Sequence, residues 1–380
     1  MKGATFMAVA GDPSGDAIAA GLVRALAAAH PGARFIGAGG PRMAAAGVAN
    51  SFDLTADAVI GLSDALRILP RFFRHKQQLA RLAAEQKPDA VILVDFEFFN
   101  RFLARAIRGA APPGWQPRIV KYVSPQVWAS RPGRAAKLAR DFDLLLCLFP
   151  FEKDWYARRV PELRVECVGH PMFDRYAAPA RKPSRGPSVL LLPGSRRGEL
   201  KRHLPVILEA ARLIAARQAA PVRFKLVAPS EEMAALTRAS LTGAEPAIEI
   251  QIGRVDEALS DTTIAIASTG TVTLECAFFG VATVALYKTS RLTYFIGRRL
   301  ATVDHLSMPN ILASEALFPE FIQHEATASN IAGAALELLA DAARRSEIQS
   351  KLAKIISTLG GPGAAQRAAA AIDRQFFASD

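Results

Sequence analysis

Cysteine and histidine are scarce in this sequence, and neither forms a cluster. The three cysteines stand far apart without a C-x-x-C pair, at Cys147, Cys167 and Cys276. This usage fits a reducing compartment. The six histidines are dispersed, with no H-x-x-x-H pair and no carboxylate cluster at metal-binding spacing. We therefore predict neither a bound metal nor a cofactor.

The sequence also lacks an apolar run of about 18 to 20 residues, the length that crosses a membrane. Even residues 264–286 are interrupted by polar side chains, namely Ser268, Thr269, Thr271, Thr273 and Glu275. The N-terminal string MKGATFMAVAGDPSGD lacks the long hydrophobic core and the cleavage site of a signal peptide. We expect a cytoplasmic protein that can still lie on a membrane surface.

Length and composition indicate a two-domain globular enzyme. A chain of 380 residues exceeds what one hydrophobic core usually serves, so we expect two domains of about 170 to 200 residues. Hydrophobic residues make up 51% and charged residues 22%, as in packed globular proteins. The net charge of +12 favours polyanions, anionic membrane surfaces or phosphorylated substrates. Nucleic acid is not predicted, because its binding signatures are absent.

Short apolar runs alternate with segments of helical spacing in two series. Such alternation is typical of parallel sheets covered by helices, so we predict an α/β protein with two Rossmann-like domains whose sheets face an interdomain cleft. The expected strands are residues 5–10, 34–38, 90–95, 118–123 and 144–148 in the first series, and 188–192, 223–227, 248–252, 263–267 and 283–287 in the second.

The predicted domain boundaries follow from a change in composition. Residues 176–187 are rich in proline and small residues, which indicates a linker between a domain over 1–175 and a domain over 188–345. Two amphipathic helices are expected over 346–380, separated by the string GGPG. These helices can pack back on the N-terminal domain.

The most informative motif is Gly194-Ser195-Arg196, within the string VLLLPGSRRGEL. An apolar run enters a turn, glycine lets the backbone approach a ligand, and arginine follows where an anion could sit. This is the pattern of a phosphate-binding loop between a strand and a helix.

A second polar string, STGTVTLE, follows the expected strand 263–267. Thr269, Gly270 and Thr271 at a helix start make a nest for a phosphate, and Glu275 about one turn later can accept the hydroxyls of a ribose. Helix capping alone also explains the serine and threonines.

Polar residues follow strands in the first series as well. Asp12, Ser14 and Asp16 in GDPSGD can either cap the next helix or contact a ligand. Asp95 ends a buried strand, where a carboxylate can serve as a base. Glu97 follows two residues later, so the identity of the inward carboxylate stays open; a helix cap or a charge held by arginine are alternatives.

Further candidates lie in YVSPQVWASR and SMPNILA. Ser124, Trp128 and Arg131 suit sugar stacking and phosphate contact, although Trp128 can equally pack between sheet and helix. Asn310 is a polar insertion between apolar runs. His170 is interpreted as a structural histidine.

A basic segment with interleaved aromatic residues suggests contact with a membrane surface. Its residues are Arg67, Arg71, Phe72, Phe73 and Arg74. Each basic residue near an anionic leaflet contributes roughly 1 kcal/mol. The alternative is a solvated helix face over an ordinary core stripe.

Taken together, the motifs resemble those of the lipid-A-disaccharide synthases, glycosyltransferase family 19, which has the two-domain GT-B fold. The resemblance rests on AGDPSGD, GAGGPRM, KYVSPQVW, LFPFEKDWY, VGHPM, LLPGSRRGEL, STGTVTLE, SMPNILA and PEFIQ, in family order. It implies transfer from UDP-2,3-diacylglucosamine to 2,3-diacylglucosamine 1-phosphate. The products would be a β-1,6 disaccharide 1-phosphate and UDP, at the cytoplasmic face of the inner membrane.

The resemblance and the motifs together suggest a role for each candidate. Asp95 would be the base and Arg196 would stabilise the leaving phosphate. The expected UDP-sugar contacts are Gly194, Ser195, Arg196, Thr269, Gly270, Thr271, Glu275 and Asn310. The expected acceptor contacts, in an N-terminal domain that faces the membrane, are Ser14, Asp16, Ser124, Trp128 and Arg131.

The sequence departs from the family pattern at several positions. VDFEFFN stands where the family has a string like IDxPDFN, so that Glu97 and Phe98 replace a proline and a second acid. Ser130 replaces a tryptophan, and Thr269 replaces a serine. A UDP-sugar 2-epimerase and a non-catalytic lipid-binding paralogue are the alternative functions. The resemblance also allows a homodimer that exchanges C-terminal segments.

Overall fold

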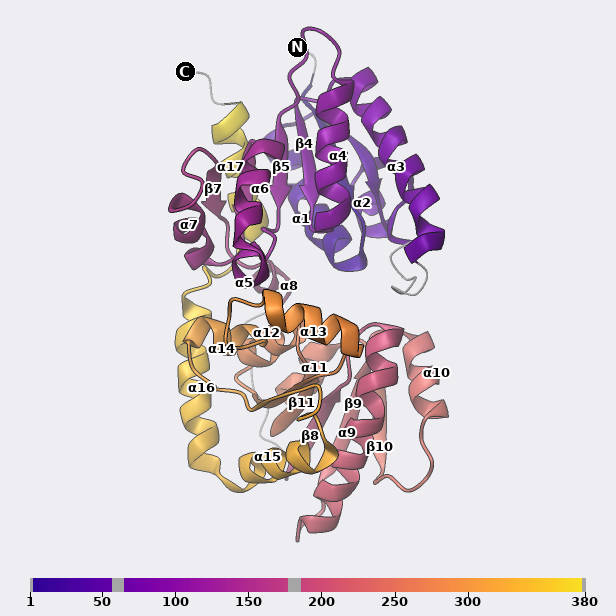
Figure 1. Cartoon of the computed structure of the whole chain (residues 1–380), viewed down its shortest axis with the longest axis vertical. Helices are drawn as coiled ribbons and strands as arrows, with labels where there is room; N and C mark the ends of the chain where they lie inside the picture. Colours follow the sequence, from indigo (N-terminus) through magenta and orange to yellow (C-terminus); the bar gives the residue numbers. More distant parts are fainter. Residues whose placement is uncertain (1–2, 57–64, 177–185, 378–380) are drawn as a thin grey trace. The chain divides into compact units, whose positions relative to one another are not determined.

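The computed structural model describes residues 3–56, 65–176 and 186–377, with the backbone alone for 65–69. The chain divides into two compact units (Figure 1). The first unit comprises Met1–Arg175 and Leu359–Asp380, and the second comprises Tyr176–Thr358. Most of the predicted linker, residues 176–187, lies outside the described residues.

The first unit is built on a sheet of seven parallel strands in the order β3-β2-β1-β4-β5-β6-β7. Its central strands are apolar and buried on both faces, as β4 shows with the sequence AVILV. The strands are β1 Thr5–Ala10, β2 Arg34–Gly39, β3 Val48–Asp53, β4 Ala90–Val94, β5 Ile119–Tyr122, β6 Leu144–Cys147 and β7 Arg164–Cys167.

Helices connect these strands. They are α1 Pro13–Ala29, α2 Pro41–Ala45, α3 Ala65–Gln86, α4 Glu97–Ala110, α5 Val127–Ser130, the 3₁₀ helix η3 Pro132–Arg134, α6 Ala135–Asp141, α7 Pro150–Ala157, α8 Met172–Arg175 and α17 Ala364–Phe376. One apolar core joins the sheet to α3, α4 and α6 through residues such as Leu79, Leu103 and Leu138.

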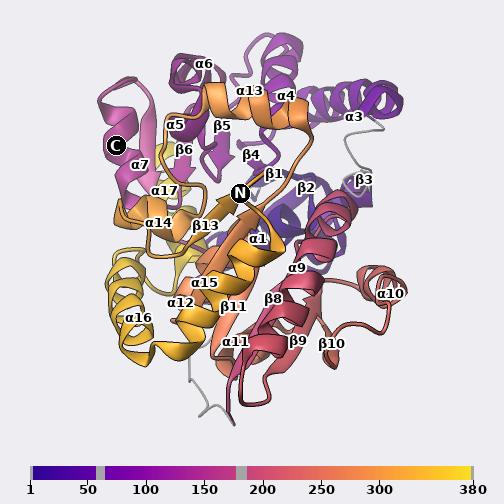
Figure 2. The same ribbon diagram turned by 60° about the horizontal axis from the view of Figure 1, so that its bottom comes forward.

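The second unit is built on six parallel strands in the order β10-β9-β8-β11-β12-β13. Its strands are β8 Ser188–Leu192, β9 Arg223–Ala228, β10 Ile248–Ile252, β11 Ile264–Ser268, β12 Ala282–Tyr287 and β13 Glu320–Ile322. Its helices are α9 Arg197–Arg217, α10 Glu231–Ala239, α11 Val255–Ser260, α12 Thr271–Phe278, α13 Arg291–Leu300, α14 Met308–Ala313, α15 Ala328–Ala340 and α16 Ala342–Ser357. Figure 2 shows α9 and α15 of this unit side by side.

The strand order reverses once in each sheet. In the first unit the chain moves outward from β1 to β3 and then returns to place β4 beside β1. In the second unit it returns in the same way to place β11 beside β8. Ligands of open parallel sheets bind outside the carboxyl ends of the strands at such a switch point. The loops after β1, β4, β8 and β11 are therefore the candidate site segments.

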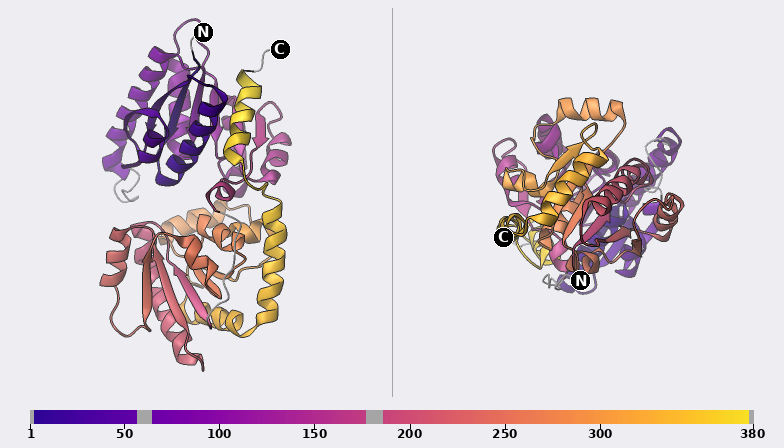
Figure 3. Two further views of the ribbon diagram at one scale, coloured as in Figure 1. Left: turned by 180° about the vertical axis from the view of Figure 1, so that it is seen from behind. Right: turned by 90° about the horizontal axis from the view of Figure 1, so that it is seen from below.

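The two C-terminal helices belong to different units. α16 packs against α12, α14 and α15 of the second unit. α17 packs against α1 of the first unit (Figure 3). Its anchor is polar as well as apolar, because Asp174 accepts from the backbone N–H of Gly363 at 2.5 Å and Asp373 contacts His30 at 2.7 Å.

Three strands were not predicted. β3 has the sequence VANSFD, in which half of the side chains are polar and only Val48 is buried. β7 and β13 are only four and three residues long. All three lie at the edge of a sheet, where one side of the strand needs no apolar partner.

Asp16 is a buried carboxylate that holds the turn between β2 and α2. It accepts from the backbone N–H groups of Gly40, Arg42 and Met43 at 2.8 to 3.0 Å. Its own helix, α1, is capped separately by Asp12, which accepts from Gly15 N at 2.6 Å. This geometry gives Asp16 a structural role; its expected contact with an acceptor stays a prediction.

We predict that Asp16→Ala destabilises the protein by about 2 to 4 kcal/mol, because two buried N–H donors and one partly buried N–H donor lose their charged acceptor. Urea unfolding followed by circular dichroism measures this loss. Ser14→Ala, a change at an exposed residue of the same helix, should stay within about 0.5 kcal/mol of wild type. Equal stability of both variants would contradict the structural role of Asp16.

Candidate functional site

The loop between β8 and α9 has a backbone that requires glycine. Gly194 has a φ of +116°, and a Cβ placed there would lie 2.6 Å from Oε2 of Glu199. Pro193 precedes it, and α9 begins at Arg197, so the first free N–H groups of the helix follow the loop directly. The turn thus brings main-chain donors and Arg196 to the end of the strand.

Glu199 holds this loop in place. Its carboxylate accepts from the backbone N–H of Ser195 at 3.0 Å and from Nη1 of Arg196 at 3.2 Å. The Arg196 side chain is nevertheless 81% exposed. Glu199 was not among the predicted site residues, although a glutamate in the first turn of a predicted helix signals a reciprocal cap.

The loop between β11 and α12 lies beside the first one. β8 and β11 are paired with Leu192 opposite Ala267. A Cβ on Gly194 would come within 3.3 Å of Oγ of Ser268. Gly270 has a φ of +142° and precedes α12, whose first residue, Thr271, is exposed. Gly194, Ser195, Arg196, Thr269, Gly270 and Thr271 are therefore brought to one edge of one sheet.

Glu275 and Asn310 are buried near this edge. Glu275 on α12 accepts from the hydroxyl of Tyr176 at 2.7 Å. Asn310 donates to the carbonyl of Phe318 and to Glu320, and its oxygen accepts from Phe318 N, all at 2.8 Å. Because these bonds occupy the amide of Asn310, its geometry is that of a positioning residue; donor contact stays a prediction.

His203 was missed by the sequence analysis. Its Nδ1 lies 2.9 Å from the carbonyl of Pro193, and its Nε2 lies 3.0 Å from N and 3.2 Å from O of Lys288. Burial lowers its pKa. A neutral imidazole thus ties the β8–α9 loop to the segment after β12.

In the first unit, the chain turns sharply after β4. Asp95 and Phe96 both have left-handed backbones, with φ of +46° and +40°. A Cβ on Gly11 would meet the Phe96 ring at 2.1 Å, and one on Gly15 would lie 3.5 Å from Cβ of Asp95. The loops after β1 and β4 are therefore in contact. Two successive non-glycine residues in this conformation store strain, a feature common at functional sites.

Lys121 on β5 lies beneath this turn and is fully buried. Its Nζ donates to the backbone carbonyl of Asp95, which also accepts from Nδ2 of Asn100 at 2.8 Å. Burial lowers the pKa of Lys121 to about 8, against the attraction of Asp95, Glu97 and Asp12. One buried cation thus faces three carboxylates. Lys121 was expected only as part of the strand over residues 118–123.

The carboxylates around Lys121 differ in their partners. Asp12 caps α1 and accepts from the hydroxyl of Ser14 at 2.7 Å. Glu97 begins α4 and lies 3.8 Å from Nη1 of Arg134. Asp95 precedes α4, at the carboxyl end of a central strand.

The expected acceptor residues fall into two groups. Ser14 and Arg131 are exposed, whereas Ser124, Trp128 and Asp16 are buried. Trp128 donates from Nε1 to Glu152 at 3.0 Å, and Ser124 donates to the hydroxyl of Tyr156 at 3.1 Å. This geometry is that of the alternative interpretation, in which Trp128 packs inside the protein.

Two further titratable groups of this unit have shifted pKa values. Burial raises the pKa of Glu152 to about 7, although the backbone N–H of Phe149 and Nε1 of Trp128 act against this rise. Burial also lowers the pKa of His170 to about 4, which favours the neutral imidazole of a structural histidine.

An apolar and basic surface forms where α3 meets α4. Phe72 packs edge-on against Phe99 at 4.9 Å between ring centroids. We call the α3–α4 patch the exposed set Arg71, Phe73, Arg74, Phe98 and Phe102. The membrane prediction named its α3 members but not Phe98 or Phe102, which belong to α4. The Arg67 side chain lies outside the described residues. None of the described helices is long and apolar enough to span a bilayer.

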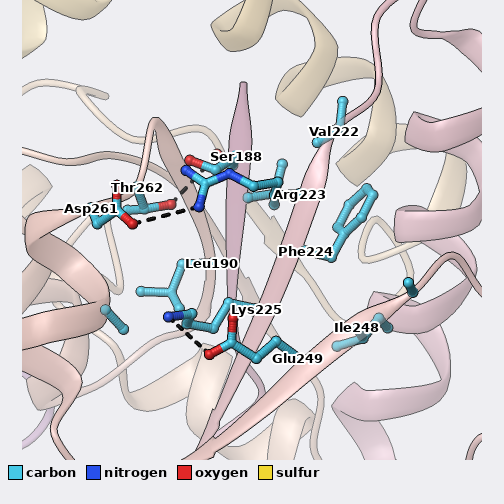
Figure 4. Close-up of a pocket in the computed structure, with 13 residues that line it drawn as sticks. Ser188, Leu190, Val222, Arg223, Phe224, Lys225, Ile248, Glu249, Asp261 and Thr262 are labelled. Carbon is cyan, nitrogen blue, oxygen red and sulfur yellow. Dashed lines mark hydrogen bonds and ion pairs between the residues drawn. The ribbon is translucent and has the colours of Figure 1, made fainter. Parts of the chain in front are cut away.

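The second unit also has a pocket at the amino ends of β8, β9 and β10 (Figure 4). Its charged residues are paired, with Arg223 at 3.5 Å from Asp261 and Lys225 at 3.1 Å from Glu249. It lies at the sheet edge opposite to the two loops described above, so we do not assign it to the site. Among the described residues, no His, Cys, Asp and Glu cluster suits a metal ion.

Solved structures with the same fold support the class that these features define. A putative UDP-N-acetylglucosamine 2-epimerase from Listeria monocytogenes aligns with a TM-score of 0.66, 15% identity and coverage of 100% of this chain and 98% of its own. MurG of Acinetobacter baumannii aligns with a TM-score of 0.56, 15% identity and coverage of 98% and 99%. The fold is GT-B.

Sequence relatives identify the family within this fold class. The family model for lipid-A-disaccharide synthetase matches residues 6–374. The lipid-A-disaccharide synthase of Alkalilimnicola ehrlichii is 37% identical over 378 residues, covering 96% of each chain. This chain belongs to the lipid-A-disaccharide synthase family, and it is a hexosyltransferase of lipid A biosynthesis.

We predict that Lys121 makes stability rise with pH. Between its folded pKa of about 8 and its ordinary value of 10.5, the unfolded chain holds a proton that the folded chain has released. Unfolding therefore becomes less favourable as the pH rises. Relative to the variant Lys121→Met, which lacks the titratable group, the free energy of unfolding of wild type should rise by roughly 2 to 3 kcal/mol between about pH 7 and pH 10. Urea unfolding of both proteins at several pH values measures this difference. If the free energies of unfolding of wild type and Lys121→Met change with pH in parallel, the prediction is wrong.

Proposed function

We propose that this chain joins UDP-2,3-diacylglucosamine to 2,3-diacylglucosamine 1-phosphate, with inversion at the anomeric carbon. The products are the β-1,6 disaccharide 1-phosphate and UDP. The observation that carries the proposal is the adjacency of the Gly194–Arg196 and Thr269–Thr271 segments, which follow the paired strands β8 and β11 at the switch point of one sheet and include the exposed Arg196.

The donor pyrophosphate would bind at these two loops. Main-chain N–H groups at the start of α9 and α12 suit phosphate oxygens, and both helix dipoles favour an anion. Ser195 and Thr271 offer exposed hydroxyls. Arg196 would stabilise the negative charge that grows on the β-phosphate as its bond to the anomeric carbon breaks. Glu275, whose carboxylate accepts from the Tyr176 hydroxyl, would bind the ribose.

Asp95 would act as the base. It would take the proton of the acceptor 6-hydroxyl while the oxygen forms its bond to the anomeric carbon, opposite to the departing UDP. The bonds from Lys121 and Asn100 to the Asp95 carbonyl support this role, because they hold the strained turn after β4 in place.

Diacylated substrates fit an enzyme that works on a membrane. We therefore assign the α3–α4 patch to the anionic cytoplasmic face of the inner membrane. Its arginines would meet lipid phosphates, and its phenylalanines would enter the acyl boundary. The acceptor residues Ser14 and Arg131 would contact the acceptor sugar phosphate, and a homodimer remains part of the proposal.

Product analysis tests the reaction directly. Purified protein is incubated with the donor and the monosaccharide 1-phosphate acceptor, and the products are identified by mass spectrometry and by the anomeric proton coupling in NMR. A β-linked disaccharide with stoichiometric UDP supports the proposal. An epimerised UDP-sugar without disaccharide would replace it with the epimerase alternative.

We predict that Asp95→Asn lowers kcat by about 10²- to 10⁴-fold, the range of a general base. Glu97→Gln is the matched control, because Glu97 faces Arg134 instead, and it should stay within about threefold of wild type. Initial rates of UDP release measure both. The reverse ranking would move the base to Glu97.

We predict that Arg196→Ala lowers kcat by about 10²- to 10³-fold, because a donor to the leaving group is lost. Arg197→Ala is the control: Arg197 is adjacent and exposed but pairs with Glu232 at 2.7 Å. The control should keep nearly full activity. Equal losses in both variants would mean that the loop needs positive charge in general and not Arg196 in particular.

A further inference from the structure

Helix α13 exposes apolar side chains to solvent. No residue of Arg291–Leu300 is buried. Leu292, Phe295 and Ile296 are 69%, 54% and 46% exposed, and Leu300 is exposed as well. Several large apolar side chains gathered on one exposed helix mark an interaction surface.

These four side chains share one face of the helix. With 3.6 residues per turn, they fall within an arc of about 140°, and Tyr294 lies on the opposite side. Tyr294 is half-buried, so its side of the helix faces the rest of the unit. The apolar face of Leu292, Phe295, Ile296 and Leu300 therefore points outward. In Figures 2 and 3, α13 (orange) stands apart from the sheet of its unit.

The charge of α13 has one sign. The helix contains Arg291, Arg298 and Arg299 and no acidic residue. The guanidinium of Arg299 lies over the ring of Phe295 at 4.1 Å, and Arg298 donates to the hydroxyl of Tyr294 at 3.0 Å. Basic side chains that extend along apolar rings can reach phosphates while the rings enter an acyl layer.

An anionic bilayer satisfies both properties of this surface. A second copy of the chain would bring the arginines of two symmetric helices together, at a cost in repulsion. A nucleic acid would bind the arginines but leave four apolar side chains without a partner. Anionic headgroups complement the arginines, and acyl chains cover the apolar face.

We infer that α13 is a bilayer-docking helix, lying in the headgroup region with Leu292, Phe295 and Ile296 directed into the acyl boundary. This inference extends the membrane part of the proposed function. It rests on other residues, because α13 belongs to the second unit and the α3–α4 patch to the first.

A fluorescent probe on α13 tests the inference in the full chain. Phe295→Cys is labelled with an environment-sensitive NBD dye in a Cys167→Ala background, since Cys147 and Cys276 are buried. Ala235→Cys, exposed on α10 of the same unit, is the matched control. Phe98→Cys reports separately on the α3–α4 patch. Each protein is mixed with phosphatidylcholine vesicles, with and without phosphatidylglycerol.

The expected result is a blue shift and an intensity gain at position 295 with anionic vesicles only, and no change at position 235. A response at position 98 without one at 295 would overturn the inference while leaving the patch in place. A response at 295 without one at 98 would support α13 and contradict the patch. Silence at both positions would overturn both.

Charge-reversal variants provide a second readout. Arg291→Glu, Arg298→Glu and Arg299→Glu together should reduce the vesicle partition coefficient at least about fivefold for each arginine replaced. Far-UV circular dichroism checks the fold. Unchanged partition would overturn the inference. Sedimentation velocity of the double variant Leu292→Ser, Ile296→Ser tests the alternative that a second copy of the chain covers this face. A changed oligomeric state with an unchanged vesicle partition coefficient would assign α13 to contact between copies.

Discussion

The hydrogen bonding of buried parallel strands is the constraint on which the rest of this structure depends. In a parallel sheet the carboxyl ends of all strands lie at the same edge. Both strand orders reverse beside the first strand of the sheet, between β1 and β4 in the first unit and between β8 and β11 in the second. At a reversal, the two following helices leave toward opposite faces, and the loops that precede them are not covered. The strained Asp95 turn and the Gly194 loop both lie at such a point. Their chemistry thus depends on a backbone arrangement that apolar strands such as AVILV and SVLLL create.

The sequence predicted the central strands well because central parallel strands are buried on both faces and appear as continuous apolar runs. The edge strands β3, β7 and β13 were not predicted because β3 is half polar and β7 and β13 are only four and three residues long. Lys121 was not predicted as a residue of the site for a related reason. A lysine in a strand normally indicates a solvated face, yet here its ammonium is buried against the Asp95 carbonyl. Only the three-dimensional proximity of Asp12, Asp95 and Glu97 explains a cation at this position.

The candidate site shows a different limit of sequence reasoning. Serine, aspartate and asparagine after a strand can bind a ligand or satisfy the backbone, and both tasks need the same donors and acceptors. Asp12 and Asp16 bind backbone N–H groups, and Asn310 has its amide occupied, whereas Arg196 is exposed and held by one glutamate. Burial and hydrogen-bond occupancy separate the two tasks, and neither can be read from residue type. Glu199 and His203 belong to a further class, since their hydrogen bonds go to the backbone of the loop itself.

The two apolar surfaces share one physical device. Lys76 lies over the ring of Phe73 at 5.0 Å on α3, and Arg299 lies over the ring of Phe295 at 4.1 Å on α13. In water, a cation over an exposed ring shields its face and keeps the charge hydrated. At an anionic surface the same cation gains a phosphate partner, and the ring becomes available to the acyl layer. In the proposed membrane-bound state, the pairs Lys76–Phe73 and Arg299–Phe295 would therefore serve both solubility and membrane affinity.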